Sequence, residues 1–164
     1  MLKYIERTRS YYSALGYEPY SWATYDKVPF CTSTKQSLSK QRVTLISTSA
    51  HLATNAGDQG PGAAYNAKAK FFKVFATPTS PTPDLRISHV NYDREHCMAD
   101  DPNTWLPIRA LKRAEATGFI GELSSEVIGL PTNRSQRVTV EQDCPDVIAH
   151  CQRLKTDVAL LVPT

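Results

Sequence analysis

The final stretch of the sequence constrains the fold more than any other part. Asp143 and Pro145 are typical of a helix start, and an apolar run, residues 157–164, follows the expected helix directly. The apolar face of that helix would consist of Val147, Ile148, Cys151 and Leu154. A helix that leads into an apolar strand is half of a right-handed βαβ crossover, the unit of parallel sheets. We therefore expect an α/β fold whose last strand, 157–164, is buried.

The rest of the chain supplies further elements of both kinds. Short β-branched or alternating runs predict a core strand at 42–48, a strand at 85–89 and an edge strand at 68–75 guarded by lysines. Helical spacing predicts helices at 2–15 and 108–117, which end at Gly16 and Gly118. Residues 49–51 would form the exit loop of the core strand, and residues 101–107 a loop before the second helix.

Together these elements predict a three-layer α/β fold with a mostly parallel, Rossmann-like (flavodoxin-like) sheet. We expect residues 1–40 to form an N-terminal helix and an irregular aromatic arm, and residues 41–164 to form the α/β domain. A length of 164 residues suits a single domain overall. Because the expected last strand has neither cap nor tail, the sheet should be incomplete at its C-terminus and the chain a fragment of a longer protein.

Composition excludes several classes of function. The 19 basic and 16 acidic residues give a net charge of +3 without a basic stripe, so nucleic acid is not an expected partner. The charged N-terminus lacks the apolar core of a signal peptide, and no apolar run approaches the length of a membrane span. We expect a cytoplasmic protein without membrane contact. Its four cysteines are spaced too widely for a redox pair or a zinc site, so they should be unpaired thiols.

The densest polar cluster, residues 88–97, lies at the end of a predicted strand, where sites of α/β proteins are found. His89 could serve as an acid or base with Asp93 orienting its ring, although a capping or core histidine is the plainer alternative. Helical spacing of His89, Asp93 and His96 also permits a metal site, but such triplets more often anchor loops. Cys97 beside His96 could be a nucleophile if it is exposed. For Asp101 ahead of the next helix, capping is the preferred interpretation.

Seven segments, in this order, resemble the selenoprotein B family of glycine, sarcosine, betaine and D-proline reductases. The most specific are the RISHVNYD stretch at 86–93, the DPNTWLP stretch at 101–107 and the GFIG stretch at 118–121. The others are YIERTR at 4–9, GYEPYSW at 16–22, RVTLIST at 42–48 and DVALLVP at 157–163. One departure is the stretch 47–51, STSAH, where the family commonly has a glycine-rich turn.

This resemblance implies a reductase subunit, or its N-terminal fragment, that cleaves a carbon–nitrogen bond of an amino acid or methylated amine. It implies a selenocysteine or cysteine immediately after Thr164, followed shortly by a second cysteine, and no other cofactor. His89, Tyr92 and Asp93 would form the supporting catalytic shell. The expected partners are the other reductase subunits, a thioredoxin-like or dithiol electron donor, and a small amine or amino-acid substrate. A chain that stops before the redox residue should be inactive alone.

Two other classes of function stay open. The first is a non-catalytic assembly or binding module that keeps the scaffold and grips a partner with the aromatics of the arm, although such aromatics usually just cover a core. These aromatics are Tyr11, Tyr12, Tyr17, Tyr20 and Trp22. The second is a metal-dependent hydrolase that would use His89, Asp93 and His96.

Overall fold

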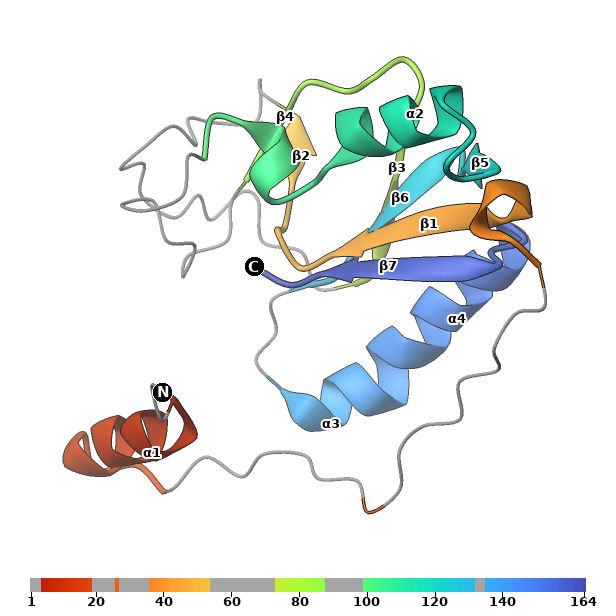
Figure 1. Ribbon diagram of the computed structural model, residues 1–164. Helices are drawn as coiled ribbons and strands as arrows, with labels where there is room; N and C mark the ends of the chain where they lie inside the picture. The colour runs from red at the N-terminus through yellow and green to blue at the C-terminus, as the bar shows by residue number, and fades with distance from the viewer. Residues whose placement is uncertain (1–3, 19–25, 27–35, 54–72, 88–98, 132–134) are drawn as a thin grey trace. The chain divides into compact units, whose positions relative to one another are not determined.

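The fold is built around one buried strand, β1 (Arg42–Ser47), of which every residue after Arg42 is buried. The computed structural model describes residues 4–18, 26, 36–53, 73–87, 99–131 and 135–164. On one edge β1 pairs in parallel with β5 (Glu122–Leu123) and then with β6 (Glu126–Gly129). On the other edge it pairs in parallel with β7 (Val158–Val162) along five residues. An antiparallel strand, β3 (Phe75–Pro78), continues the sheet beyond β6 (Figure 1).

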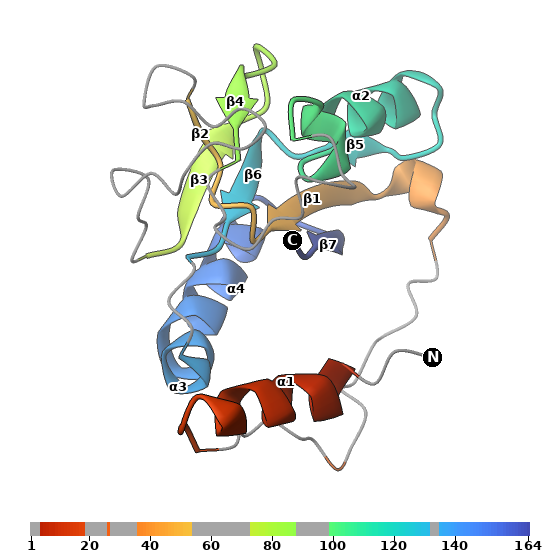
Figure 2. The ribbon, with the colours of Figure 1, turned by 90° about the vertical axis from the view of Figure 1, so that its left-hand side faces the viewer.

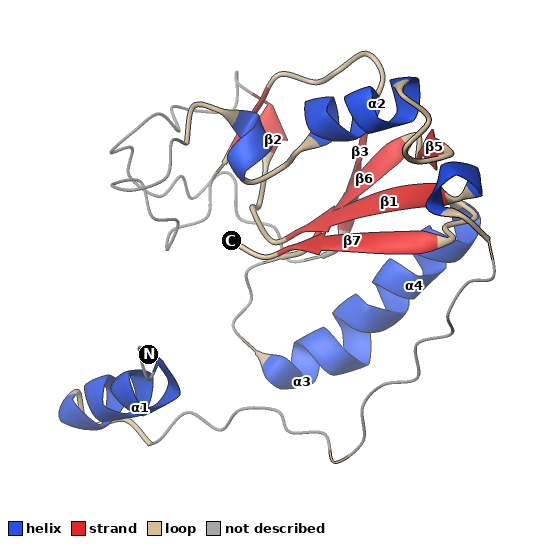
Figure 3. Cartoon of the chain, in the orientation of Figure 1, coloured by secondary structure: helices blue, strands red, loops and turns tan. Residues whose placement is uncertain are grey.

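The remaining elements are helices and one small pair of strands (Figure 3). The strands β2 (Leu52–Ala53) and β4 (Leu85–Arg86) pair with each other, antiparallel and apart from the main sheet. Two 3-10 turns span Leu38–Lys40 and Pro102–Thr104, and a π-helical turn spans Thr139–Asp143. The α-helices are α1 (Tyr4–Ala14), α2 (Ile108–Ala116), α3 (Gln136–Val138) and α4 (Cys144–Arg153).

The sheet buries a different set of side chains on each face. Val43, Leu45 and Val127 pack with Trp105 and Ile108 on the face that α2 covers. The opposite face, which α4 covers, is smaller, and its buried members are Ile46, Ile128 and Leu154. Adjacent residues of β1 thus point into different cores, as the alternation of side chains along a strand requires. The protein is a mixed α/β structure with an open, mostly parallel sheet and few helices (Figure 1).

The chain divides into two units, Met1–Ser33 and Thr34–Thr164. In the first unit α1 ends at Gly16, which has a φ of +78°, and the amide of Tyr17 bonds back to the carbonyl of Tyr12. The second unit contains the whole main sheet. The sequence-based division at residue 40 stays a prediction.

Four predicted elements are confirmed. The strand at 42–48 is β1, the helix at 2–15 is α1, and the helix at 108–117 is α2, which ends at Gly118 with a φ of +71°. Residues 157–164 do contain a strand, β7. In each case the apolar period was long and a glycine or turn residue marked its end.

The prediction that the last strand is buried was wrong. β7 lies at an edge of the sheet, and Ala159, Leu160 and Leu161 are exposed. Within the described part of the chain no strand pairs with its outer side, and α4 covers Ile46 but not the neighbouring Leu161. An apolar run is equally compatible with a central and an edge position, because sequence does not give the strand order.

The last helix also begins earlier than predicted. Helical structure starts at Gln136, capped by the Ser135 hydroxyl, and reaches α4 through the π-helical turn. Pro145 has no amide hydrogen and interrupts the regular bonding there, and a wider turn just before it accommodates the ring. Ile148, predicted to be on the apolar face, is 56% exposed.

Two strands, β5 and β6, were missed because the sequence around them, GELSSEVIGL, mixes polar and apolar residues without a sustained period. Of the edge strand predicted at 68–75 only residues 73–75 are described, and the strand observed there, β3, begins at Phe75. The predicted strand at 85–89 is described only as far as residue 87, where β4 forms its start.

Gly129 is required by the packing of β3 on β6. It is paired with Phe75, and a Cβ atom at Gly129 would lie 2.1 Å from the tip of the Phe75 ring. We predict that Gly129→Ala lowers the free energy of unfolding by about 1–2 kcal/mol, the usual cost of overpacking, measured by urea denaturation. Combined with Phe75→Leu, the same substitution should cost clearly less than the sum of the two single changes.

The matched control is Gly118→Ala. Gly118 has no atom within 4 Å of a Cβ position, so its substitution tests backbone conformation alone. Its cost should be unaffected by Phe75→Leu. Additive costs for Gly129→Ala and Phe75→Leu would contradict the steric explanation.

Candidate functional site

The carboxyl ends of β1 and β7 lie side by side, and the residues that follow them are bonded to each other. The amide of Thr164 donates to the Thr48 hydroxyl at 2.9 Å, and the two hydroxyl oxygens are 3.2 Å apart. The amide of Thr48 in turn donates to the carbonyl of Val162. In open parallel sheets ligands bind beyond these strand ends, so the carboxyl end of the sheet is the candidate site.

The exit loop of β1 turns sharply beneath this edge. The Ser47 hydroxyl donates to the carbonyl of Trp105 at 3.0 Å and accepts from the amide of Ser49 at 3.1 Å. Ala50 follows with a φ of +47°, in the left-handed region that favours glycine. The loop is thus fixed by buried hydrogen bonds. It contains no glycine, although the family that this sequence resembles commonly has glycine at this turn.

The turn directs His51 into the protein, where the side chain is 1% exposed. Its Nδ1 lies 3.3 Å from the Ser49 hydroxyl and its Nε2 lies 3.0 Å from the Thr77 hydroxyl. The Phe75 ring packs against the imidazole with the ring centres 4.8 Å apart. Burial lowers the pKa of His51 to about 4, so the ring is neutral at physiological pH.

A neutral imidazole between two hydroxyls is a hydrogen-bonding link and not a charged group. It links the exit loop of β1 to β3, which lies on the far side of β6, and so holds the loop in place. Because His51 is buried, its role at this edge is to position the loop, while Thr48 and Thr164 lie nearer the surface. The hydroxyls at the edge can donate and accept hydrogen bonds to a small polar ligand.

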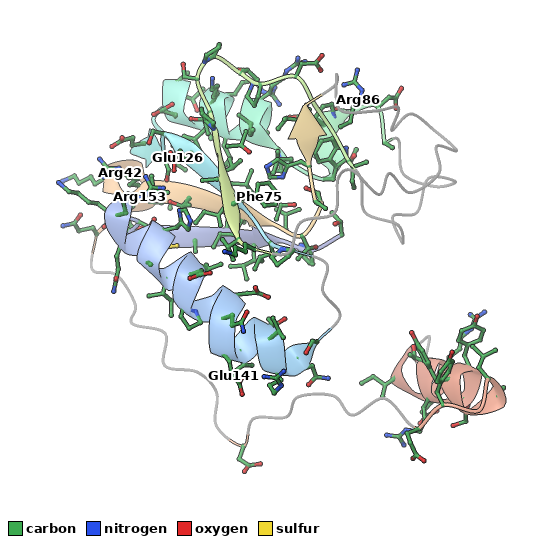
Figure 4. All side chains as sticks on the ribbon, turned by 180° about the vertical axis from the view of Figure 1, so that it is seen from behind. Arg42, Phe75, Arg86, Glu126, Glu141 and Arg153 are labelled. Atoms are coloured by element: carbon green, nitrogen blue, oxygen red, sulfur yellow. The ribbon has the colours of Figure 1, made fainter. Side chains whose placement is uncertain are left out.

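Two of the ion pairs formed by the described residues lie at the opposite, amino end of the sheet. Arg42 bonds to Glu122 at 2.7 Å, and this carboxylate raises the pKa of the guanidinium. Arg153 pairs with Glu126, and Figure 4 shows Arg42, Glu126 and Arg153 together at this end of the sheet, away from Phe75. The Arg42 amide donates to Asp157 at 2.8 Å, which anchors the start of β7. The open hollows here are lined by the paired Arg42 and Glu122 and by the exposed Lys155. The two ion pairs join β1 to β5 and α4 to β6, so we assign them a structural role.

The predicted catalytic residues His89, Tyr92 and Asp93 lie outside the described residues, as do His96 and Cys97. The structure therefore does not bring them together or separate them. The capping role of Asp101 is confirmed, because its carboxylate accepts from the amide of Asn103 at 2.9 Å. Among the described residues there is no group of three or more His, Cys, Asp or Glu side chains that could hold a metal ion. None of the described helices has both the length and the apolar character needed to cross a membrane.

Sequence reasoning missed the buried group formed by Ser49, His51 and Thr77. It placed residues 49–51 in an exit loop but gave His51 no role. The available signal was position, since His51 follows a core strand at its carboxyl end. The pairing with Thr77 had no signal, because it depends on β3 lying antiparallel at the far side of β6.

Comparison with known proteins adds no family. No family model, no curated protein and no solved structure matches this chain.

The depressed pKa of His51 predicts a specific dependence of stability on pH. The folded protein holds a neutral ring down to about pH 4, whereas the unfolded chain protonates it near pH 6.5. The unfolded state thus binds more protons between these values, so stability falls as pH falls through this window. At pH 5 the loss attributable to His51 should be about 2 kcal/mol relative to pH 7.5.

The measurement is urea denaturation of the wild type and His51→Gln at several pH values. His51→Gln should be less stable near neutrality but should lose less stability between pH 7.5 and pH 5. His150→Gln is the matched control, because His150 lies on the surface of α4 near Arg153. If His51→Gln keeps the full wild-type pH dependence, the ring is not buried in its neutral form.

Proposed function

We propose that this chain is a subunit, or the N-terminal portion, of a selenoprotein B-type reductase, with its reaction centre at the carboxyl ends of β1 and β7. One observation carries the proposal: Thr164 is hydrogen-bonded to Thr48, the residue that follows the central strand β1. The resemblance puts the selenocysteine or cysteine directly after Thr164. A residue there would emerge beside Thr48, at the edge where parallel sheets bind their ligands.

The fold we propose for the complete reductase is the three-layer, Rossmann-like sheet of the flavodoxin-like type. Parallel pairing of β1 with β5, β6 and β7 supports it, as does the presence of α2 and α4 on opposite faces. The antiparallel β3 at one edge is compatible with it, because such sheets often carry an antiparallel edge strand.

The proposed reaction is the reductive cleavage of a carbon–nitrogen bond. The selenolate or thiolate attacks the α-carbon and the amine leaves with a proton. A second thiol then attacks the selenium or sulfur and forms a selenenyl-sulfide or disulfide. The bond to the α-carbon breaks, and the rest of the substrate leaves with a proton on that carbon. A dithiol donor reduces this bond and is itself oxidised to a disulfide, which balances the two electrons.

His89, Tyr92 and Asp93 are the residues we propose to position the substrate or to donate the proton to the leaving amine. They follow β4, and the resemblance rests in part on the stretch that contains them. In this proposal His51 supports the exit loop and does not contact the substrate. The proposed partners are the other reductase subunits and a thioredoxin-like or dithiol donor in the cytoplasm.

The first test is the coding sequence that follows the Thr164 codon. An in-frame TGA or a cysteine codon, with a second cysteine codon shortly after it, supports the proposal. The protein extended by these residues should then show dithiol-dependent reduction of at least one of glycine, sarcosine, betaine and D-proline. Serine in place of the residue after Thr164 should lower the rate about 1,000-fold or more.

Cys151→Ser is the matched control, because this thiol packs under the sheet on α4 and should not affect the rate. Loss of activity with Cys151→Ser, or an unchanged rate in the serine variant of the extended protein, would contradict the proposed centre. An ordinary stop codon followed by unrelated sequence would contradict the reductase proposal, because the chain would then lack the selenocysteine or cysteine that the reaction needs.

A second function, the assembly module, is favoured by the exposed aromatics of the first unit. Tyr11 and Tyr17 are 62% and 63% exposed, and Tyr12 contacts both rings edge to face. Exposed aromatics of this kind are frequent anchors of interfaces. If these aromatics grip a partner, Tyr11→Ala with Tyr17→Ala should weaken co-purification of that partner at least 10-fold, with the helix content by circular dichroism unchanged. Arg7→Ala on the same helix is the control and should not change co-purification; equal binding by both variants would exclude a role of the tyrosines.

A further inference from the structure

The outer edge of β7 has the properties of an interface. Along Val158–Val162 the strand has no charged residue and no proline, yet it lies at the edge of the sheet. Leu160 is 38% exposed and Leu161 is 65% exposed. Edge strands are normally protected by lysine, proline, a bulge or a covering element, because their free amide and carbonyl groups pair readily with other strands.

The apolar surface includes both faces of this edge. Leu160 is paired with Leu45 and so points to the α2 face, whereas Leu161 is paired with Ile46 and points to the α4 face. Figure 2 shows that α4 lies under β6 and β1 and not under β7. An occupant must therefore supply a strand for the backbone groups and apolar side chains for both faces.

We propose that this occupant is β7 of a second copy of the chain, paired antiparallel about Leu160 to form one continuous sheet across a two-fold axis. All five residues of the strand then pair: Leu160 with its own mate, Val158 with Val162, and Ala159 with Leu161. The pattern is self-complementary on the α4 face, because the large Leu161 lies opposite the small Ala159. A two-fold contact uses the edge completely and does not propagate into a fibre.

The charges around the edge are compatible with this arrangement. Asp157, at the start of β7, accepts from the Arg42 amide within its own chain and faces no charge of the strand opposite. A two-fold axis perpendicular to the sheet keeps both α4 helices on one face and makes them antiparallel. The first turn of each, with Asp146, then lies toward the same end as the last turn of the other, with Arg153, so the arrangement does not bring like charges of the two helices to the same end.

The oligomeric state of the chain of residues 1–164 tests this interface, independently of the proposed function. Analytical ultracentrifugation of the wild type should show a dimer at about 100 μM or below. Leu161→Lys should raise the dimer dissociation constant about 100-fold or more, because a lysine would be buried without a partner at the interface. Its melting temperature at low concentration should match that of the wild-type monomer, since Leu161 is mostly exposed within one chain.

Phe119→Lys is the matched control. Phe119 is 68% exposed and lies just before β5, which pairs with β1 on the edge opposite β7. This variant should dimerise like the wild type. Leu160→Cys should form a covalent dimer under mild oxidation, whereas Phe119→Cys should not, because only residue 160 meets its own mate across the axis. A wild type that stays monomeric, or a dimer that Leu161→Lys leaves intact, would overturn the proposal.

Discussion

The pairing of β1 on both of its edges is the constraint on which the rest of the second unit depends. β5 and β6 take one edge in succession, and β7 takes the whole length of the other. A strand buried on both faces and paired on both edges has no freedom to slip, because a shift of one residue would exchange its two cores. The positions of Ser49 and His51 follow from this fixed register, since the exit loop begins where the pairing ends.

The two ends of the sheet are held by different chemistry. At the amino end Arg42 and Glu122 form a partly exposed ion pair, which contributes little stability in water, and Asp157 accepts from the Arg42 amide. At the carboxyl end the groups are neutral and buried, and each has a hydrogen-bond partner. Unpaired buried groups of this kind would cost about 1–3 kcal/mol each, so the carboxyl end is the more sensitive to substitution. This asymmetry suits a candidate ligand site at the carboxyl end of the sheet, where the buried loop beside it must keep its shape.

Sequence reasoning recovered those parts of the fold that are written in local patterns. β1, α1 and α2 have a clear apolar period, and the positive φ of Gly16 and Gly118 marks the ends of the two helices. What it could not recover depends on contacts between distant residues. The edge position of β7, the antiparallel pairing of β3 and the contact of His51 with Thr77 all require the strand order, which no local pattern contains.

The same argument explains why the candidate site was predicted from position more than from residue type. Both the expected cluster at 88–97 and the observed group at 47–51 follow strands, and both contain a histidine beside hydroxyl-bearing residues. Burial is what distinguishes a structural histidine from one that exchanges protons with a substrate, and burial is a property of the fold. His51, with a pKa of about 4, belongs to the first kind. A proton donor for the proposed cleavage must therefore be sought among exposed residues at the carboxyl end of the sheet, and not among the buried residues of the exit loop.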